Sequence, residues 1–326
     1  MTSTRAQGRP RASLSLDLDN LWSYQKIHGD AGWDAFPSYL ERGVPIILEQ
    51  LKRHGVRLTV FIVGQDAALA KNAGALRAIT DAGHEVGNHS FSHEPWLHTF
   101  DRPRIEREIA DAEAHIERVT GKRPRGFRGP GFSLSQDTLE VLAERDYLYD
   151  ASTFPTFLGP IARAYYFFQT PPLDDAEKEK RKLLFGKASD GLQPLAPYTW
   201  ELPGRPLLEI PVTTMPVTRA PIHMSYVIYL ALRSRAVARA YLASAMALCR
   251  ARGVEPSYLL HPLDFLGGDE VKELAFFPGM GATTRWKHEV FADVIGAIQG
   301  SFQTVTMEEH AEELLASARL GRRRFG

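Results

Sequence analysis

Two histidines four residues apart follow a short segment typical of a β-strand. The chain reads GHEVGN and then HSFSH, which places His89 and His93 at the end of an expected strand over residues 84–88. If the chain turns helically after this strand, both imidazoles lie on one side, at a spacing that lets their nitrogens bind one divalent cation. A lone histidine is usually a core or surface residue, but a pair at a strand end favours a metal site.

Two aspartates lie in an apolar segment near the N-terminus, which reads SLSLDLDN. In a strand, alternation places Asp17 and Asp19 on one face and the leucines beside them on the other. Carboxylates in such surroundings are costly unless a cation or hydrogen bonds compensate their charge. One carboxylate and two histidines supply three metal ligands and leave positions for water and substrate, and the second carboxylate is then free to act as a base.

These two motifs, in this order, resemble those of the polysaccharide deacetylases, carbohydrate esterase family 4, which share the NodB homology domain. The resemblance extends over about residues 12–310 as an ordered set of motifs. It implies that Asp17 is the general base and Asp19 a metal ligand. The family motif H-S/T-x-x-H is matched in full by His89, Ser90 and His93.

A third motif of the family, R-x-P, corresponds to the segment FRGPGF. The resemblance implies that Arg128 orients the base aspartate and that the main-chain N–H of Gly131 belongs to an oxyanion hole. A glycine suits this position because it lets the backbone approach a substrate oxygen closely. We expect the neighbouring Pro130 and Phe132, and Trp22 after the first motif, to contact the substrate.

The segment SYLLHP matches the family's strand that ends in the acid histidine, here His261. Such a histidine can protonate the leaving amine. In the family a carboxylate holds this histidine, and Asp150 in YLYDAS is our best candidate, although the usual D-x-x-D-W form is absent. Asp264, three residues after the histidine, is a rival partner and a candidate substrate contact.

The resemblance implies a metal-dependent hydrolysis of an N-acetyl amide. Asp17 would take a proton from the attacking water, the Gly131 N–H would stabilise the oxyanion, and His261 would protonate the amine. Zinc suits two imidazoles and a carboxylate best, and Co²⁺, Ni²⁺, Mn²⁺ or Fe²⁺ can occupy the same ligand set. We expect an N-acetylated amino sugar as substrate, either free, nucleotide-linked, lipid-linked or in a glycoside.

Three other functions occur on the same fold. Two are enzymatic, namely deformylation of a lipid-linked amino sugar and opening of a ureide ring. The third is a catalytically inactive glycan-binding module, which would lack a motif residue. The expected motif residues favour an enzyme because six of them are present, namely Asp17, Asp19, His89, His93, Arg128 and His261.

Strand-like and helical segments alternate along the chain, as they do in folds built from βα units. We therefore expect an α/β fold, a distorted (β/α) barrel of seven or eight strands. The strands are expected at residues 14–19, 57–63, 84–88, 126–129, 147–150, 207–210, 258–261 and 302–305. Helices are expected at residues 45–54, 65–82, 102–120 and 136–145.

We expect one domain over residues 13–318, between a flexible N-terminus, 1–12, and a basic tail, 319–326, whose end RRRFG is expected to be frayed and solvated. An irregular insertion, 154–206, breaks the alternation and suggests a substrate lid or a structural excursion. Two aromatic and apolar segments, 164–168 and 224–232, could receive a lipid carrier, nucleotide or glycoside, or could be packing.

Composition excludes several classes of partner and location. Thirty-nine basic and thirty-nine acidic residues give a formal net charge of zero, which argues against nucleic acid as a partner. The single cysteine, Cys249, excludes an internal disulfide and is expected to be buried. Arginines interrupt the most apolar segment, 221–249, so a transmembrane helix is not expected. The N-terminal segment lacks a signal-peptide pattern, so we expect a cytoplasmic protein that meets a membrane only through a lipid-linked substrate.

Overall fold

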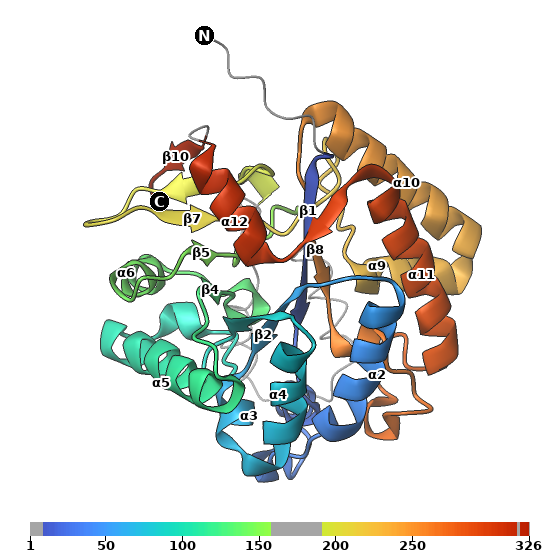
Figure 1. Ribbon diagram of the computed structural model, residues 1–326. Coiled ribbons are helices and arrows are strands. Elements are labelled where there is room, and N and C mark those ends of the chain that lie inside the picture. The colour runs from blue at the N-terminus through green and yellow to red at the C-terminus, as the bar shows by residue number, and fades with distance from the viewer. Residues whose placement is uncertain (1–8, 158–190, 318–319, 326) are drawn as a thin grey trace.

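One sheet contains all the strands that the structure describes (Figure 1). The structure is a computed structural model that describes residues 9–157, 191–317 and 320–325. The strands are β1 Arg11–Asp17, β2 Thr59–Ile62, β3 Glu85–Asn88, β4 Gly126–Phe127, β5 Tyr149–Asp150, β6 Tyr198–Trp200, β7 Leu207–Glu209, β8 Ser257–Leu260, β9 Gln303–Val305 and β10 Gly321–Arg323. Their order is β10-β6-β7-β5-β4-β3-β2-β1-β8, and β9 pairs with β1. The expected α/β fold is confirmed.

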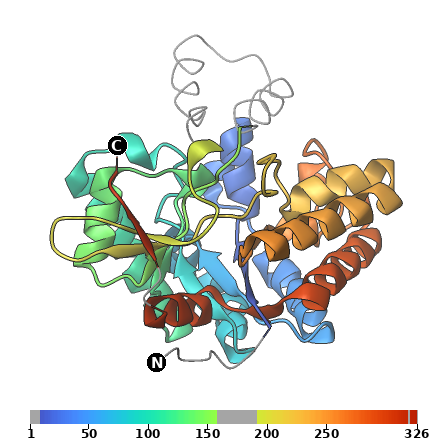
Figure 2. The ribbon, with the colours of Figure 1, turned by 90° about the horizontal axis from the view of Figure 1, so that it is seen from above.

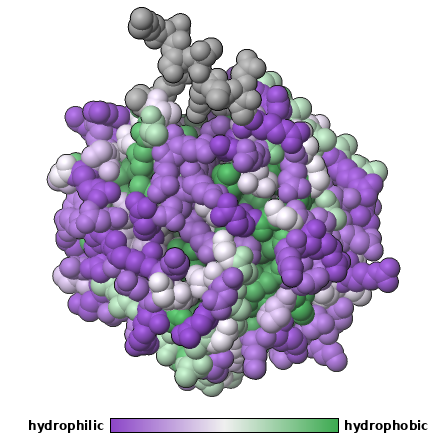
Figure 3. Space-filling model, in the orientation of Figure 1, coloured by the Kyte–Doolittle hydropathy of each residue, from purple (hydrophilic) through white to green (hydrophobic). Residues whose placement is uncertain are grey.

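Helices surround the sheet, as the two ribbon views show (Figures 1 and 2). The helices are α1 Leu21–His28, α2 Leu40–Arg53, α3 Gly64–Ala68, α4 Ala73–Asp81, α5 Arg102–Thr120, α6 Gln136–Glu144, α9 Met224–Arg233, α10 Arg235–Arg252, α11 Thr284–Ser301 and α12 Met307–Ala316. Helices α9, α10 and α11 pack on one another, as do α4, α5 and α6 in sequence. Hydrophilic residues cover most of the face seen in Figure 3, with apolar residues showing between them.

Strand β1 lies between β2 and β8 and is buried on both faces. Leu14 and Leu16 belong to the main apolar core, in which residues of the surrounding helices pack against the sheet. The alternate positions carry Ser13, Ser15 and Asp17, which are also buried. Since β1, β2, β3, β4 and β8 run parallel, their carboxyl ends meet at one edge of the sheet. Ligands of open α/β sheets bind at this edge.

The sheet curls without closing, because β8 and β10 are not paired with each other among the described residues. Strand β6 runs antiparallel to β7, and β10 pairs with β6. The strand β6 was not predicted, and β10 overlaps the end of the tail, RRRFG, that was expected to be frayed. That expectation was wrong, because the backbone of Gly321–Arg323 finds hydrogen-bond partners on an edge strand.

Several predicted boundaries shift in the structure. Strand β1 begins at Arg11, inside the expected flexible N-terminus, of which residues 1–8 lie outside the described part. The expected helix 65–82 is two helices, α3 and α4, separated by a short 3₁₀ turn at Ala70–Asn72. Helix α2 begins at Leu40 and includes Pro45, so its start lies upstream of the expected one.

The structure describes only one of the two aromatic and apolar segments. Residues 164–168 fall within 158–190, outside the described part of the chain, so the lid hypothesis for the insertion stays a prediction. Residues 224–232 form most of α9, whose side chains Met224, Val227, Ile228 and Ala231 are buried, which favours packing.

Cys249 is buried as expected. Among the described helices, none has the length and apolar character to cross a membrane.

Candidate active site

The two histidines of the HSFSH motif meet Asp19 at the carboxyl edge of the sheet. One ligand atom from each of Asp19, His89 and His93 can be chosen so that the three lie within 4.8 Å of one another. Asp19 Oδ1 is 2.9 Å from His93 Nε2 and 3.7 Å from His89 Nε2. It is shielded from solvent and makes no hydrogen bond within the described residues. Two imidazole nitrogens that face one carboxylate oxygen fit a divalent cation.

The surroundings of Asp19 favour its ionised form, and burial favours the neutral form of His89. Burial raises the pKa of Asp19, but the charges of His93, His89 and His261 outweigh burial and lower the pKa to about 2. Burial lowers the pKa of His89. An ionised carboxylate and a neutral imidazole are the protonation states that bind metals.

The histidines come together through an irregular loop and not through the helical turn that we expected. Residues 89–93 are not helical, and Ser90 and His93 have left-handed φ angles of 59° and 50°. The turn prediction was wrong because side chains fix this loop. The buried carboxylate of Glu108, on α5, accepts hydrogen bonds from the backbone N–H groups of Phe91 at 3.0 Å and Ser92 at 2.8 Å.

Asp19 also reaches the site by a different route than predicted. Strand β1 ends at Asp17, so the pleat of a strand does not align the two aspartates. Instead the chain turns after the strand, with the Asp19 N–H donating to the Asp17 carbonyl at 2.9 Å. The Tyr39 hydroxyl donates to the Asp19 carbonyl oxygen and holds this turn.

Arg128 holds the other aspartate, as the R-x-P motif implied. Its guanidinium is fully buried and donates to Asp17 Oδ1 at 2.7 Å, to Ser15 Oγ at 2.8 Å and to the Ala151 carbonyl at 3.0 Å. The same group lies over the Phe61 ring, 4.5 Å from its centroid. These contacts fix Arg128, which in turn holds Asp17 Oδ1 two residues before the ligand candidate Asp19.

The main chain of the same residue holds a metal-ligand candidate. The Nδ1 atom of His89 lies 2.6 Å from the carbonyl oxygen of Arg128. A carbonyl only accepts, so Nδ1 carries the proton and Nε2, which faces Asp19, keeps a free lone pair. Metal-binding histidines are commonly oriented in this way.

His261 lies beside Asp264 at the end of β8. Its Nδ1 is 3.8 Å from Asp264 Oδ2, and Ser225 Oγ donates to the other oxygen of that carboxylate at 2.9 Å. Burial lowers the pKa of His261, but Asp264, together with Asp17 and Asp19, outweighs burial and raises the pKa to about 9. His261 is therefore a cation at neutral pH, which is the form that can donate a proton.

Comparison with known proteins finds similarity to deacetylases over part of the chain. Residues 30–149 match the family model for polysaccharide deacetylases. A peptidoglycan deacetylase-like protein of Gibberella zeae is 32% identical over 150 residues, which are 45% of this chain and 42% of that protein. A peptidoglycan-N-acetylglucosamine deacetylase of Bacillus cereus is 30% identical over 104 residues, 32% of this chain and 37% of that protein.

The similarity to the polysaccharide deacetylase family covers residues 30–149. The match includes His89, His93 and Arg128, whereas Asp17, Asp19 and His261 lie outside it and are joined to them by the geometry above. A protein of Mycobacterium smegmatis assigned to the polysaccharide deacetylases has the same fold, with a TM-score of 0.64 at 20% identity over 99% of this chain and 96% of that one. The chain spans less than half the length of the two curated relatives.

The deacetylase motif RGPGF forms a tight turn. Residues Pro130–Phe132 make one 3₁₀ turn in which Gly131 is exposed with a φ of 59°. A side chain at Gly131 would be strained at this φ and would come 3.1 Å from Pro95. Pro130 is buried and shapes the turn, while Phe132 is half-buried. The oxyanion role of the Gly131 N–H stays a prediction.

A row of rings connects this turn with the histidine at the end of β8. Phe132 stacks on Phe154 with ring centroids 4.8 Å apart, and Phe154 lies 5.4 Å from His223. His223 in turn lies 6.2 Å from His261. Burial lowers the pKa of His223 to about 3, so this ring is neutral. Neither Phe154 nor His223 was identified from the sequence, because neither belongs to a motif.

Asp150 is not the partner of His261, contrary to our preferred prediction. Its carboxylate is fully buried and accepts hydrogen bonds from the Ser152 hydroxyl at 2.6 Å and the Ser152 N–H at 3.2 Å. It adjoins a second buried carboxyl group, Glu209, and burial raises the pKa of both. The structure thus brings Asp264 and not Asp150 to His261, because Asp264 lies one short turn after β8.

Trp22 packs behind the metal cluster. It is 1% exposed, so it offers no surface to a substrate, contrary to our expectation. Its ring meets that of His93 edge-on at 6.4 Å, and its Nε1 donates to Asp66 Oδ1 at 3.0 Å. Asp66 was missed, although it follows β2 at the same edge of the sheet as the predicted residues.

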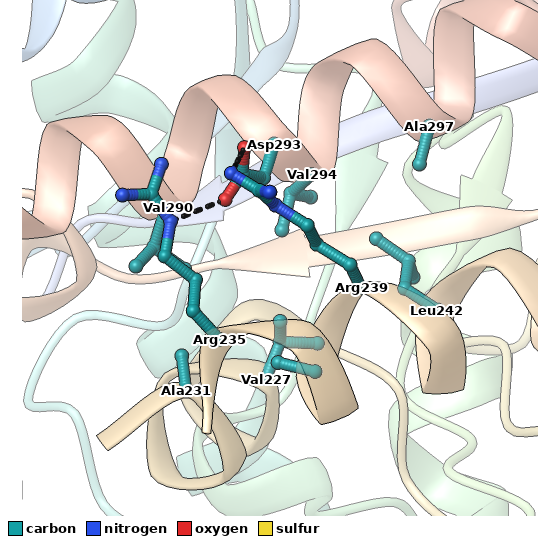
Figure 4. Close-up of a pocket in the computed structure, with 10 residues that line it drawn as sticks. Val227, Ala231, Arg235, Arg239, Leu242, Val290, Asp293, Val294 and Ala297 are labelled. Carbon is teal, nitrogen blue, oxygen red and sulfur yellow. Dashed lines mark hydrogen bonds and ion pairs between the residues drawn. The ribbon is translucent and has the colours of Figure 1, made fainter. Parts of the chain in front are cut away.

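Two hollows lie apart from these residues. One of about 40 Å³ lies between α9, α10 and α11, where Arg235 and Arg239 both pair with Asp293 (Figure 4). A larger one, of about 350 Å³, is lined by residues that precede β1, β8 and β9, including Pro10, Val254 and Phe302. It therefore lies at the amino edge of these strands, and none of the predicted site residues lines either hollow.

Proposed function

We propose that the protein is a metal-dependent hydrolase that removes the acetyl group from an N-acetylated amino sugar. The observation that carries this proposal is the cluster of Asp19, His89 and His93 just after the strand that ends at Asp17, whose Oδ1 a buried arginine binds. Metal-dependent amide hydrolysis requires a set of metal ligands, a fixed general base and a cationic histidine as general acid.

The metal would be held by Asp19, His89 and His93. A divalent cation bound there would acidify water and polarise the substrate carbonyl. We propose zinc, because two imidazoles and one carboxylate suit it, with Co²⁺, Ni²⁺, Mn²⁺ and Fe²⁺ as alternatives for the same ligands.

Asp17 would act as the general base. Its Oδ1 is bound to Arg128, so the carboxylate keeps its direction while its other oxygen accepts the proton of the attacking water. The water oxygen forms the new bond to the amide carbon. The resulting oxyanion would be stabilised by the N–H of Gly131, whose position lets the backbone approach it closely.

His261 would complete the reaction. As the C–N bond breaks, its imidazolium transfers a proton to the leaving nitrogen, which departs as a neutral amine, and the acetyl group leaves as acetate. Asp264, 3.8 Å from the imidazole, stabilises the charged form needed for this step.

The names of the relatives support a glycan substrate, since one is a peptidoglycan-N-acetylglucosamine deacetylase and another, from Bacillus subtilis, a peptidoglycan-N-acetylmuramic acid deacetylase. The substrate could be a free, nucleotide-linked or lipid-linked sugar or a glycoside. Deformylation or ureide opening would use the same residues. An inactive glycan-binding module is disfavoured because the ligand set and the held base are both assembled.

Release of acid from a panel of substrates tests the proposal. The zinc-loaded protein is incubated with free, nucleotide-linked and lipid-linked N-acetyl and N-formyl amino sugars, N-acetylated glycan oligomers and a cyclic ureide. We expect acetate from at least one acetylated sugar and none from the Asp17→Asn variant. Formate release or ureide opening alone would reassign the reaction, and no turnover of any compound by metal-loaded protein would contradict an enzymatic function.

A further inference from the structure

The two histidines of the metal cluster differ in what their second ring nitrogen contacts. His89 donates from Nδ1 to the Arg128 carbonyl oxygen at 2.6 Å. Nδ1 of His93 is buried and has no hydrogen-bond partner within the described residues. Metal-binding histidines almost always donate this N–H to a carboxylate, a carbonyl or water. Nδ1 of His93 therefore lacks the direct hydrogen-bond acceptor that such a histidine usually has.

A buried carboxylate with a spare oxygen lies nearby. Asp66, in α3, is 1% exposed, and its Oδ1 accepts hydrogen bonds from Asn20 at 2.7 Å, Trp22 at 3.0 Å and Asn72 at 3.1 Å. Its Oδ2 is equally shielded from solvent and accepts none among the residues described. A buried carboxylate oxygen without a donor is costly, so this atom also calls for a partner.

Trp22 brings the side chains of Asp66 and His93 into one neighbourhood. Its indole N–H donates to Asp66 while its ring packs edge-on against the ring of His93. Trp22 thus contacts both the carboxylate and the imidazole, which form no direct hydrogen bond with each other.

We propose that Asp66 is the positioning residue for His93, with one buried water that accepts the Nδ1–H of His93 and donates to Oδ2 of Asp66. One such water would satisfy both orphaned atoms, and buried waters usually bridge polar groups of this kind. The arrangement keeps the proton on Nδ1 and leaves the Nε2 lone pair for the metal. This inference rests on the metal site of the proposed function.

Zinc affinity, measured on the full chain by competition with a chelator, tests the proposal. Asp66→Asn keeps the acceptor for Asn20 and Trp22 but replaces Oδ2 by an amide that cannot accept. We expect zinc to bind about 10–100-fold more weakly. The rate constant kcat measured at saturating zinc should stay close to that of the wild type, because the variant loses metal and not a catalytic group.

Asn72→Ala is the matched control. It removes a donor to Oδ1 of the same carboxylate and leaves Oδ2 unchanged, so its zinc affinity should stay within about twofold of the wild type. Circular dichroism of the metal-free proteins verifies that both variants are folded. If Asp66→Asn does not fold, a zinc-bound crystal structure of the wild type decides, through the presence or absence of the bridging water.

The outcomes separate this inference from the proposed function. Failure of the wild type to bind zinc or any other divalent ion would contradict the metal site itself. Unchanged affinity in Asp66→Asn, with tight binding by the wild type, would contradict only the role of Asp66. Equal losses in Asp66→Asn and Asn72→Ala would also overturn that role, because they would show that the hydrogen-bond network merely holds the loop.

Discussion

The carbonyl oxygen of Arg128 lies 2.6 Å from Nδ1 of His89, while the guanidinium of the same arginine donates to Asp17 at 2.7 Å. One residue at the end of β4 therefore orients both a metal-ligand candidate and the candidate base. Because its guanidinium is fully buried, its geometry is fixed by packing. Arg128 therefore sets the position of the candidate base relative to the metal ligands.

Arg128→Ala should destabilise the protein as well as inactivate it. The substitution leaves Asp17 buried without its cation, and breaking a buried ion pair in this way typically costs about 3–5 kcal/mol. Denaturant unfolding of the metal-free protein measures the loss. A decrease below about 1 kcal/mol would show that solvent reaches Asp17 and that the pair is not effectively buried.

Removal of the two imidazoles should abolish metal binding. The wild type should contain one divalent ion per chain by elemental analysis, and His89→Ala combined with His93→Ala should contain none, because Asp19 alone is a weak ligand. Hydrolysis should be lost in parallel. If the double variant kept stoichiometric metal, the ion would have to bind elsewhere.

The two aspartates should have separable roles. Asp17→Asn should keep the metal and lose turnover, because an amide cannot accept the proton of the attacking water. Asp19→Asn should weaken metal binding itself, since Asp19 Oδ1 lies between the two histidine nitrogens. Metal content and kcat, measured on both variants, distinguish the roles, and exchanged phenotypes would reverse the assignment.

Activity should fall as the pH rises through about 9, where His261 loses its proton. Asp264→Asn removes the carboxylate charge that raises this pKa and leaves the burial that lowers it. The basic limb of the kcat profile should therefore move to lower pH, by about one unit. Asp150→Asn is the control, and a shift caused by that variant instead would restore Asp150 as the partner of His261.

Loss of His261 should depend on the leaving group. His261→Ala should keep its metal and lower kcat on an amide by about 10²–10⁴-fold, the usual effect of a lost general acid. The loss should be smaller on an activated ester, because its leaving group needs no protonation. Equal losses on both substrates would indicate that His261 supports structure or binding.

The sequence alone determined which residues could meet at the site. Motifs placed His89, Arg128 and His261 directly after β-rich segments, and parallel strands end at one edge of a sheet. The helix Arg102–Thr120 was predicted at its observed bounds, and Gly121 closes it in a left-handed conformation. These signals are local, so a single sequence reveals them.

Only the tertiary structure decided how the residues meet. The loop that carries His93 is fixed by Glu108 from a different helix, and the partner of His261 proved to be Asp264 and not Asp150. Asp66 gave no motif signal at all, yet it lies behind the metal cluster. Such choices depend on which buried polar groups satisfy one another across the fold. Long-range packing sets these pairings, and spacing along the chain does not encode them.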